Sequence, residues 1–268
     1  MRVFALSDLH LSLARPKPMD IFGAWWSDHV RRIETAWRAT VGPDDVVCLP
    51  GDFSWALKLE NVLGELEWLG GLPGRKGLVK GNHDYWWASL AKVRAALPSG
   101  IFVLQNDSVT IGDTAFAGAR GWVDARLDFA GLCERPEGVA AADRLPSIGE
   151  GEEEDRNLYQ KELTRLEASL RQINPEARFR VALVHFPPTS PAMEATEVTA
   201  LLERYHIDAV VFGHLHRAGP TSFTNPYGTR KGITYYLVSA DFVGFRPVAL
   251  SIPGTPAFSA ARPEGLSS

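Results

Sequence analysis

Five short clusters in this chain of 268 residues contain histidine, aspartate or asparagine, and each comes after an apolar run typical of a buried β-strand. The clusters are Asp8-Leu9-His10, Gly51-Asp52, Gly81-Asn82-His83-Asp84, Val184-His185-Phe186 and Gly213-His214-Leu215-His216. The ends of neighbouring strands lie side by side, so we expect these side chains to converge. Together they supply carboxylate, amide and imidazole groups, which bind divalent metal ions such as Mn, Fe or Zn.

Candidate metal ligands make up most of these clusters: Asp8, His10, Asp52, Asn82, His185, His214 and His216. The set is larger than one ion needs and suits two ions that share a bridging carboxylate. It contains no thiolate, which excludes a structural cysteine-type zinc site and favours a catalytic site with open coordination positions. The residue types therefore predict a dinuclear metallohydrolase with two divalent cations as cofactors.

The spacing within two clusters predicts the direction in which the ligand side chains point. Asp8 and His10 are two residues apart, so on an extended strand both side chains point the same way. His214 and His216 repeat this spacing on another strand end. A single cluster of this kind is a weak signal. The prediction depends on five clusters in this order, each after an apolar run.

The elements that must position these clusters alternate in the first part of the chain. Apolar runs and helical spacing predict strands at Arg2–Ser7, Asp45–Leu49 and Gly77–Lys80, and helices at Asp28–Val41, Lys58–Leu69 and Tyr85–Leu97. Asp84 stands where the N-cap of the third helix is expected. Strand–helix–strand order favours a partly parallel sheet.

The later part of the chain reads as a further series of strands with one long helix. Strands are predicted at Ile101–Leu104, Ser108–Ile111, Thr114–Ala119, Arg180–Val184, Asp208–Phe212, Ile233–Ser239 and Pro247–Leu250, and a helix at Asp155–Ile173. Two packed sheets with outer helices account for this pattern. We expect one domain over residues 1–253, with a connector and helix inserted at 121–175, and a flexible tail at 254–268.

Composition limits the classes of function. The formal net charge of −4 does not favour binding to extended nucleic acid, although metal ions would supply positive charge for a nucleotide-sized substrate. The two cysteines, Cys48 and Cys133, imply no disulfide framework, and we expect Cys48 in the core. No apolar stretch approaches a membrane-spanning length. We therefore expect a cytoplasmic protein without membrane contact.

The ordered motifs D-x-H, G-D, G-N-H-[DE], H and G-H-x-H resemble those of the calcineurin-like metallophosphoesterase superfamily, and they extend from Asp8 to His216. Within it, the chain is most similar to bacterial phosphohydrolases with a G-D-[FI]-S-W-A motif, which is Gly51-Asp52-Phe53-Ser54-Trp55-Ala56 here. The resemblance implies an α/β fold, a four-layer α/β/β/α sandwich of two mixed sheets flanked by helices.

The resemblance also implies how the ligands are shared. The first metal would be held by Asp8, His10 and His216, the second by Asn82, His185 and His214, and both would be bridged by Asp52. Two catalytic residues follow: His83 beside the substrate phosphate, and Asp84 orienting its ring. A hydroxide bridging the two metals would attack the phosphorus in line.

Departures from the pattern narrow the substrate class. Trp55 stands where Ser/Thr protein phosphatases of the superfamily carry a second Asp, and no Arg follows it. Without an added arginine clamp for a dianionic phosphate, we favour phosphodiesterase activity on a small phosphoester, with nucleotides as one candidate. Phosphomonoesterase or nuclease activity stays as an alternative. A metal-free binding scaffold is disfavoured because every ligand is retained, and the sequence leaves the oligomeric state undecided.

Aromatic residues near the clusters allow two interpretations. Trp86 and Trp87 follow the third cluster, and they either pack in the core or form a wall of the site. Trp25 and Trp26 lie in the segment after Asp8-Leu9-His10, where a loop either shapes specificity or packs at the surface. For Arg120, a salt bridge is the default and contact with a substrate phosphate the alternative.

Overall fold

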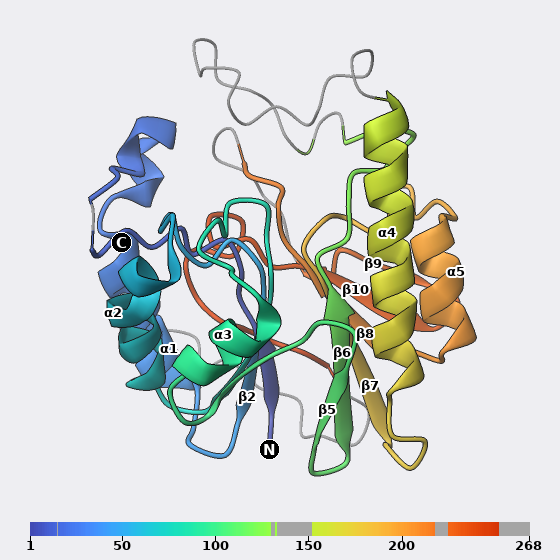
Figure 1. Ribbon diagram of the computed structural model, residues 1–268, viewed down its shortest axis with the longest axis horizontal. Helices are drawn as coiled ribbons and strands as arrows, with labels where there is room; N and C mark the ends of the chain where they lie inside the picture. The colour runs from blue at the N-terminus through green and yellow to red at the C-terminus, as the bar shows by residue number, and fades with distance from the viewer. Residues whose placement is uncertain (15, 130–131, 133–151, 218–224, 252–268) are drawn as a thin grey trace, which may run out of the picture.

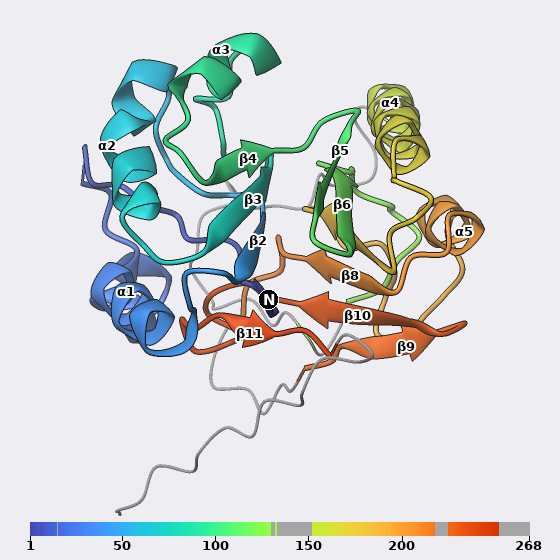
Figure 2. The same ribbon diagram turned by 90° about the horizontal axis from the view of Figure 1, so that it is seen from below.

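Two β-sheets pack face to face in the computed structural model of the protein, and helices cover the outer face of each (Figures 1 and 2). The structure describes residues 1–14, 16–129, 132, 152–217 and 225–251. Cys133 and the tail expected at 254–268 lie outside the described residues. The order of layers is helix, sheet, sheet, helix, which confirms the expected four-layer α/β sandwich. No helix in the described ranges has the length and apolarity to cross a membrane.

The first sheet has the strand order β11-β1-β2-β3-β4. Its members are β1 (Val3–Ala5), β2 (Val46–Pro50), β3 (Arg75–Val79), β4 (Ile101–Val103) and β11 (Val248–Ala249). The first four strands run parallel to one another, and β11 is antiparallel at the edge beside β1. The carboxyl ends of the four parallel strands therefore lie at the same edge of the sheet.

The second sheet has the order β5-β6-β7-β8-β10-β9. Its members are β5 (Ser108–Ile111), β6 (Thr114–Ala119), β7 (Phe179–Val184), β8 (Ala209–Phe212), β9 (Gly228–Arg230) and β10 (Ile233–Leu237). The four central strands β6, β7, β8 and β10 are parallel, and β5 and β9 pair antiparallel at the two edges.

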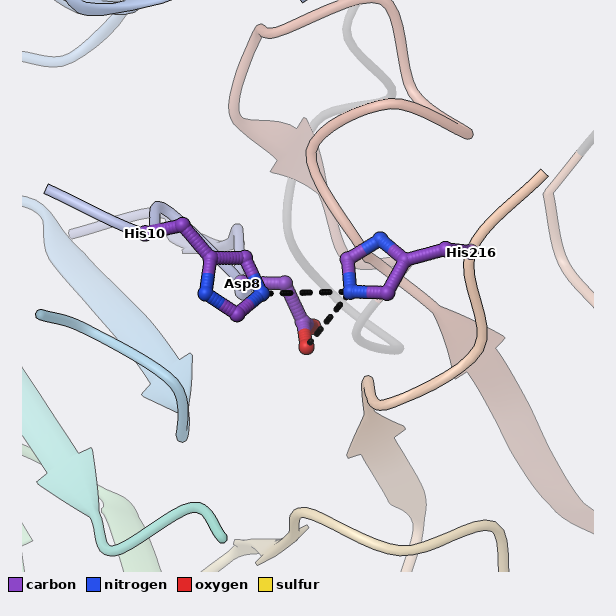
Figure 3. Close-up of side chains that lie close together, drawn as sticks. All are labelled: Asp8, His10 and His216. Carbon is purple, nitrogen blue, oxygen red and sulfur yellow. Dashed lines mark hydrogen bonds and ion pairs between the residues drawn. The ribbon is translucent and has the colours of Figure 1, made fainter. Parts of the chain in front are cut away.

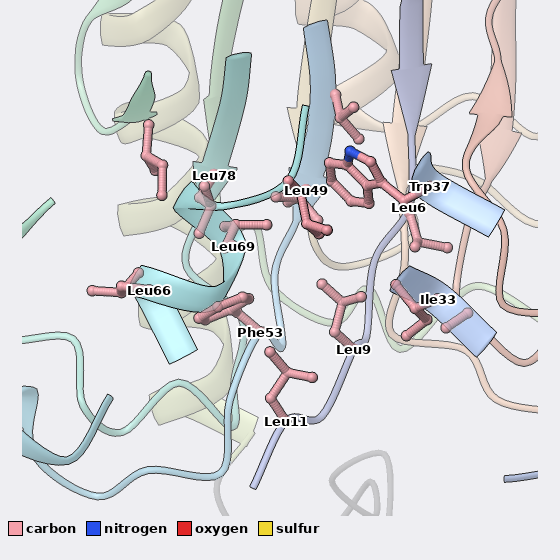
Figure 4. Close-up of a cluster of buried hydrophobic side chains, with 14 of the residues drawn as sticks. Leu6, Leu9, Leu11, Ile33, Trp37, Leu49, Phe53, Leu66, Leu69 and Leu78 are labelled. Atoms are coloured by element: carbon pink, nitrogen blue, oxygen red, sulfur yellow. The ribbon is translucent and has the colours of Figure 1, made fainter. Parts of the chain in front are cut away.

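Three helices cover the first sheet and two cover the second among the described residues (Figure 2). They are α1 (His29–Thr40), α2 (Leu59–Gly70), α3 (Leu90–Ala96), α4 (Glu152–Arg171) and α5 (Glu197–Arg204), besides the short 3₁₀ turns η1 (Asp20–Phe22) and η2 (Ala24–Trp26). Figure 4 shows α1 placing Ile33 and Trp37, and α2 placing Leu66 and Leu69, in the same apolar cluster as Leu49 of β2. Spacings of three and four residues put each pair on one helix face.

The central strands β1, β2, β6, β7, β8 and β10 are buried on both faces, which explains their largely apolar sequences. In β7, Val181 and Leu183 face the first sheet, whereas Ala182 and Val184 pack in the cluster beneath α4 and α5. Alternate side chains therefore enter two different apolar clusters, and all of them are apolar. A strand of this kind is recognised from its apolar run and not from alternation.

Three local predictions were wrong or incomplete. Helix α3 begins after Ser89 and not after Asp84, because the Asp84 carboxylate bonds to other loops. The strands predicted at Ile101–Leu104 and Ser108–Ile111 are neighbours in the sequence but belong to different sheets as β4 and β5, and β5 forms a hairpin with β6. The short elements α5 and β9 were not predicted.

The two sheets are joined by main-chain hydrogen bonds at the residue that leads from β1 to the first cluster. The Ser7 N–H donates to the Val238 carbonyl at 2.8 Å, and the Ala240 N–H donates to the Ser7 carbonyl at 2.9 Å. These bonds make a parallel bridge between Ser7 and Ser239. The segment after β1 is thereby fixed beside the segment after β10 of the other sheet.

A test of this architecture is Leu183→Ala in β7. Leu183 is fully buried between the sheets. We expect the truncation to lower the free energy of unfolding by about 2–5 kcal/mol, because it removes buried apolar surface and leaves a cavity. Urea denaturation measures the change. Leu57→Ala is the control, since Leu57 is 62% exposed and should change stability by less than about 0.5 kcal/mol. Equal effects of the two variants would contradict the inter-sheet core.

Candidate metal centre

The clusters come together at the edge where the parallel strands of both sheets end. Asp8 and His10 follow β1, Asp52 follows β2, and Asn82 follows β3 in the first sheet. The remaining ligands come from the second sheet, where His185 follows β7, and His214 and His216 follow β8. Loops at the carboxyl ends of parallel strands are the usual place for a binding site in α/β folds.

Asp8, His10 and His216 form one group whose potential ligand atoms all lie within 4.8 Å of one another. Figure 3 shows the three side chains pointing toward one another. The two Nε2 atoms of His10 and His216 are 3.2 Å apart, and His216 Nε2 is 3.7 Å from Asp8 Oδ1. Asp8 and His10 are not on an extended strand as expected. Both have left-handed φ angles, 56° and 45°, so the chain curls to bring them together.

Asn82, His185 and His214 form a second group. Asn82 Oδ1 lies 2.6 Å from His185 Nε2 and 3.0 Å from His214 Nδ1. The carboxylate of Asp52 faces both groups, because its Oδ2 is 3.8 Å from His10 Nε2 and 3.5 Å from His185 Nε2. All seven sequence-derived candidates therefore meet at one place.

The other ring nitrogens of two histidines are held by the protein. His185 Nδ1 is 3.0 Å from the Pro50 carbonyl oxygen. A carbonyl only accepts, so Nδ1 donates there and the neutral ring turns a lone pair at Nε2 toward Asn82 Oδ1, which also accepts. A divalent cation beside them would satisfy both acceptors at once. The donor set thus fits a divalent metal ion.

Asp241, which sequence reasoning missed, plays the same part for His216. Its Oδ1 lies 3.2 Å from His216 Nδ1, and its Oδ2 accepts from the Arg217 N–H at 2.9 Å. A carboxylate behind a ligating histidine fixes the ring and makes it more basic. The only sequence signal was a polar residue four positions after β10, at the same edge of the sheet as β8.

Two glycines allow the loops to approach one another this closely. A Cβ on Gly81 would meet Asp52 Oδ1 at 2.0 Å, and a Cβ on Gly213 would meet Asp8 Oδ2 at 2.1 Å. Real Cβ atoms essentially never come so near another heavy atom. Each glycine therefore keeps a space beside a candidate carboxylate ligand.

The buried Asp84 carboxylate connects the second and third clusters. It accepts from five N–H groups: those of Gly81, Asp52, Phe53 and Ser54 in the main chain and the indole N–H of Trp86. A further hydrogen bond links the same two loops, because Asp52 Oδ1 accepts from the His83 N–H at 2.8 Å. These contacts give Asp84 a role in holding both loops together, and its expected role in orienting the His83 ring stays a prediction.

Burial dominates the electrostatics of the centre. It raises the pKa of Asp8 to about 6 and that of Asp52 well above its ordinary value, while it lowers the pKa of His185 well below and that of His214 to about 3. Burial also lowers the pKa of His216, but the carboxylates of Asp241, Asp8 and Asp52 together outweigh it and the pKa rises to about 9. Neutral imidazoles are ready ligands, and a buried carboxylate needs hydrogen-bond donors or a cation to stay ionised.

Aromatic rings enclose the first group. Trp26 is buried, with its ring centroid 6.0 Å from that of His10 and 5.7 Å from that of His216. Trp55 stacks on His10 at 4.8 Å and lies 4.5 Å from the His83 ring. Trp86 and Trp87 pack in the core behind the first sheet, as the core interpretation had it.

The centre opens to solvent on one side. The side chain of His216 is 34% exposed, whereas that of His10 is 3% and that of His185 is fully buried. Arg120 forms a salt bridge with Glu162 at 3.2 Å, so its guanidinium is committed to helix α4. The centre is therefore accessible from the His216 side.

The sequence of this chain matches a family model and two curated proteins. The sequence model described as calcineurin-like phosphoesterase matches residues 1–218. The chain is also similar to the Gene 66 proteins of two mycobacteriophages, at 35% identity over 78 residues for phage L5 and 39% over 83 residues for phage D29. These matches cover 29% and 31% of this chain, and the chain spans only 37% and 40% of those relatives.

Two solved structures are similar at lower identity. One is a protein of unknown function from Aquifex aeolicus, with a TM-score of 0.44, 15% identity and coverage of 92% of this chain and 95% of that chain. The other is GAP50, the anchor in the inner membrane complex of Plasmodium, with a TM-score of 0.49, 11% identity and coverage of 90% and 72%.

The charge state of the centre predicts how metal affinity depends on pH. In the metal-free protein the pKa of His216 is raised to about 9, that of Asp8 to about 6 and that of Asp52 well above its ordinary value, so a metal must displace at least one proton below pH 9 and more below pH 6. We expect the affinity for Mn²⁺ to fall about tenfold or more per pH unit from pH 9 to 6 and more steeply below pH 6. Isothermal titration calorimetry across this range measures it. An affinity independent of pH would contradict the assigned ligands.

Proposed function

Because the chain belongs to the calcineurin-like phosphoesterase family, we propose that it hydrolyses a small phosphoester with two divalent metal ions as cofactors. The position of Asp52 carries this proposal. Its carboxylate faces the group of Asp8, His10 and His216 as well as His185 of the other group. One carboxylate shared by two sets of ligands is the arrangement that a dinuclear centre requires.

The ligand residues divide the work in this proposal. Asp8, His10 and His216 hold one ion, Asn82, His185 and His214 hold the other, and Asp52 is the bridge. The two ions would acidify a water molecule and draw charge from the phosphoryl oxygens. Asp241 and the Pro50 carbonyl keep the His216 and His185 rings in their ligating orientation.

His83 is our candidate for the general acid. Its main chain is tied to Asp52, and its ring lies 5.6 Å from that of His10 and against Trp55. From this place the ring reaches the substrate side of the metals, where it stabilises the phosphoryl charge or protonates the leaving oxygen. We propose Asp84 as a positioning residue that acts through the loops and so fixes where His83 stands.

Phosphodiesters are the substrate class that we favour. Trp55 occupies the position of the second Asp of the protein phosphatases, and Arg120, one candidate for a phosphate clamp, is paired with Glu162. A singly charged diester needs fewer cationic contacts than a dianionic monoester. Phosphomonoesterase activity is the second candidate for the same centre.

The direct test is turnover of bis-p-nitrophenyl phosphate and p-nitrophenyl phosphate by protein loaded with Mn²⁺. We expect faster hydrolysis of the diester. Asp52→Asn should remove tight binding of one ion and lower kcat by about a thousandfold, since the bridge to the nucleophile is lost. Metal content by mass spectrometry accompanies the kinetics.

Asp44→Asn is the matched control, because Asp44 is exposed and precedes β2, whereas Asp52 follows it. It should leave both readouts unchanged. Faster monoester hydrolysis would overturn the diester preference. Two tightly bound ions and full turnover in Asp52→Asn would overturn the bridging role.

The role of His83 is tested by His83→Asn, with His206→Asn at an exposed position as control. We expect an unchanged metal content and a loss in kcat of about a hundredfold or more for adenosine 2′,3′-cyclic phosphate, whose alkoxide leaving group needs a proton. The loss should be smaller for bis-p-nitrophenyl phosphate, because nitrophenolate leaves without one. If the variant loses a metal ion instead, His83 is a ligand.

A further inference from the structure

Three arginines gather beside the solvent-facing side of the centre. Arg32 lies on α1, Arg217 directly follows His216, and Arg246 lies in the segment between β10 and β11; together they are the arginine cluster. Burial lowers the pKa of Arg32, and the charges of Arg217 and Arg246 lower it further, so the three sit within electrostatic reach of one another. Like charges held together in this way repel and attract an anion.

Aromatic rings hold the cluster in place. The Arg217 guanidinium lies 5.2 Å from the centroid of the Trp25 ring, and that of Arg32 lies 4.3 Å from the Phe245 ring. Arg32 also donates to the Trp25 carbonyl at 2.5 Å. The neighbouring carboxylate of Asp28 forms its ion pair with Arg31. In the part of the chain that the structure describes, no salt bridge neutralises the arginine cluster.

Two buried N–H donors beside the arginine cluster have no acceptor among the described residues. The buried Nε of Arg217 and the buried Nε1 of Trp25 make no hydrogen bond to any described residue. Buried donors are nearly always satisfied, and an exception calls for a bound partner. A guanidinium and an indole N–H side by side, with a second guanidinium tied to the same tryptophan, are donors that suit the oxygens of a phosphate.

The arginine cluster stands apart from the metal ligands, although it is next to them in sequence. Arg217 follows the exposed ligand His216, but its side chain lies on Trp25. The ring that packs against His10 and His216 is that of Trp26. Of these two adjacent tryptophans, Trp26 therefore contacts the candidate metal ligands and Trp25 contacts the arginine cluster.

From this juxtaposition we propose that Arg217, Arg32 and the indole N–H of Trp25 form a subsite for a second, non-scissile phosphate of the substrate. The proposal rests on the proposed function, because it places the scissile phosphate at the metals. It names the substrate class more closely, as a phosphoester that carries another phosphate group. Arg246 adds positive charge to the same subsite.

The first test uses protein stripped of metal, so that the metal centre itself contributes no cation for the anion. Inorganic phosphate is titrated by calorimetry at low ionic strength. We expect one phosphate per chain, with binding weakened about tenfold in Arg217→Gln and in Arg32→Gln, because each loses a charged hydrogen-bond donor. Arg31→Gln is the matched control on the same helix turn and should bind like wild type. Equal affinity in all four proteins would overturn the subsite.

The second test asks whether the subsite serves the substrate. Protein loaded with Mn²⁺ is assayed with thymidine 5′-p-nitrophenyl phosphate and with its 3′-phosphorylated form. We expect kcat/KM to be about tenfold higher for the 3′-phosphorylated ester, and Arg217→Gln to reduce this ratio toward one. Arg31→Gln should keep the ratio of wild type.

Other results would separate the two proposals. An equal loss of kcat/KM on both esters in Arg217→Gln would place Arg217 at the scissile phosphate and overturn the subsite, as would an absent advantage for the 3′-phosphate in wild type. If wild type hydrolyses neither ester, nor the simple nitrophenyl esters, the proposed function fails. Phosphate binding to the metal-free protein is then still decided by the first test.

Discussion

The hydrogen bonds between Ser7 and the segment after β10 are the constraint on which the rest of the centre depends. They join the main chains of the two sheets one residue before Asp8. The Asp8 carboxylate then accepts from the His214 N–H at 3.1 Å, so a residue of the first sheet is fixed to a loop of the second. Ligands contributed by both sheets face one another only because this junction sets the distance between the two edges.

The same junction brings several buried carboxylates close together, and each needs a partner for its charge. Asp8, Asp52 and Asp84 are all buried within one small region, where a charged carboxylate is costly without a partner. Asp84 is satisfied by five N–H donors and needs no metal. Asp8 lies beside His216, whose pKa is raised to about 9, so the two can form an ion pair. Asp52 instead faces His10 and His185, whose ordinary charge is suppressed by burial, and a bound cation would be its partner. Membership of the calcineurin-like phosphoesterase family agrees with that chemistry.

Tryptophans give this member of the family its own surroundings. Trp55 contacts His10 and His83, Trp26 contacts His10 and His216, and Trp25 supports Arg217. Rigid rings around a metal centre restrict the movement of the ligating imidazoles and shape the approach of the substrate. The candidate ligands are therefore surrounded by aromatic and cationic side chains contributed by η2, α1 and the segments after β2, β8 and β10.

The sequence by itself determined most of the elements and the candidate ligands, because a buried parallel strand is encoded by an apolar run and a metal ligand must be one of few residue types. The runs ending near Asp8, Asp52 and His185 identified both the strands and the edge at which the ligands meet. Only the tertiary structure decided how the ligands are held. Asp241 and the arginine cluster carry no local pattern, since their partners are 24 or more residues away or come from three separate segments. The left-handed turns at Asp8 and His10, and the capture of Asp84 by two loops, likewise follow from the contact between chain segments. Propensity describes neighbours in sequence, whereas these features depend on neighbours in space.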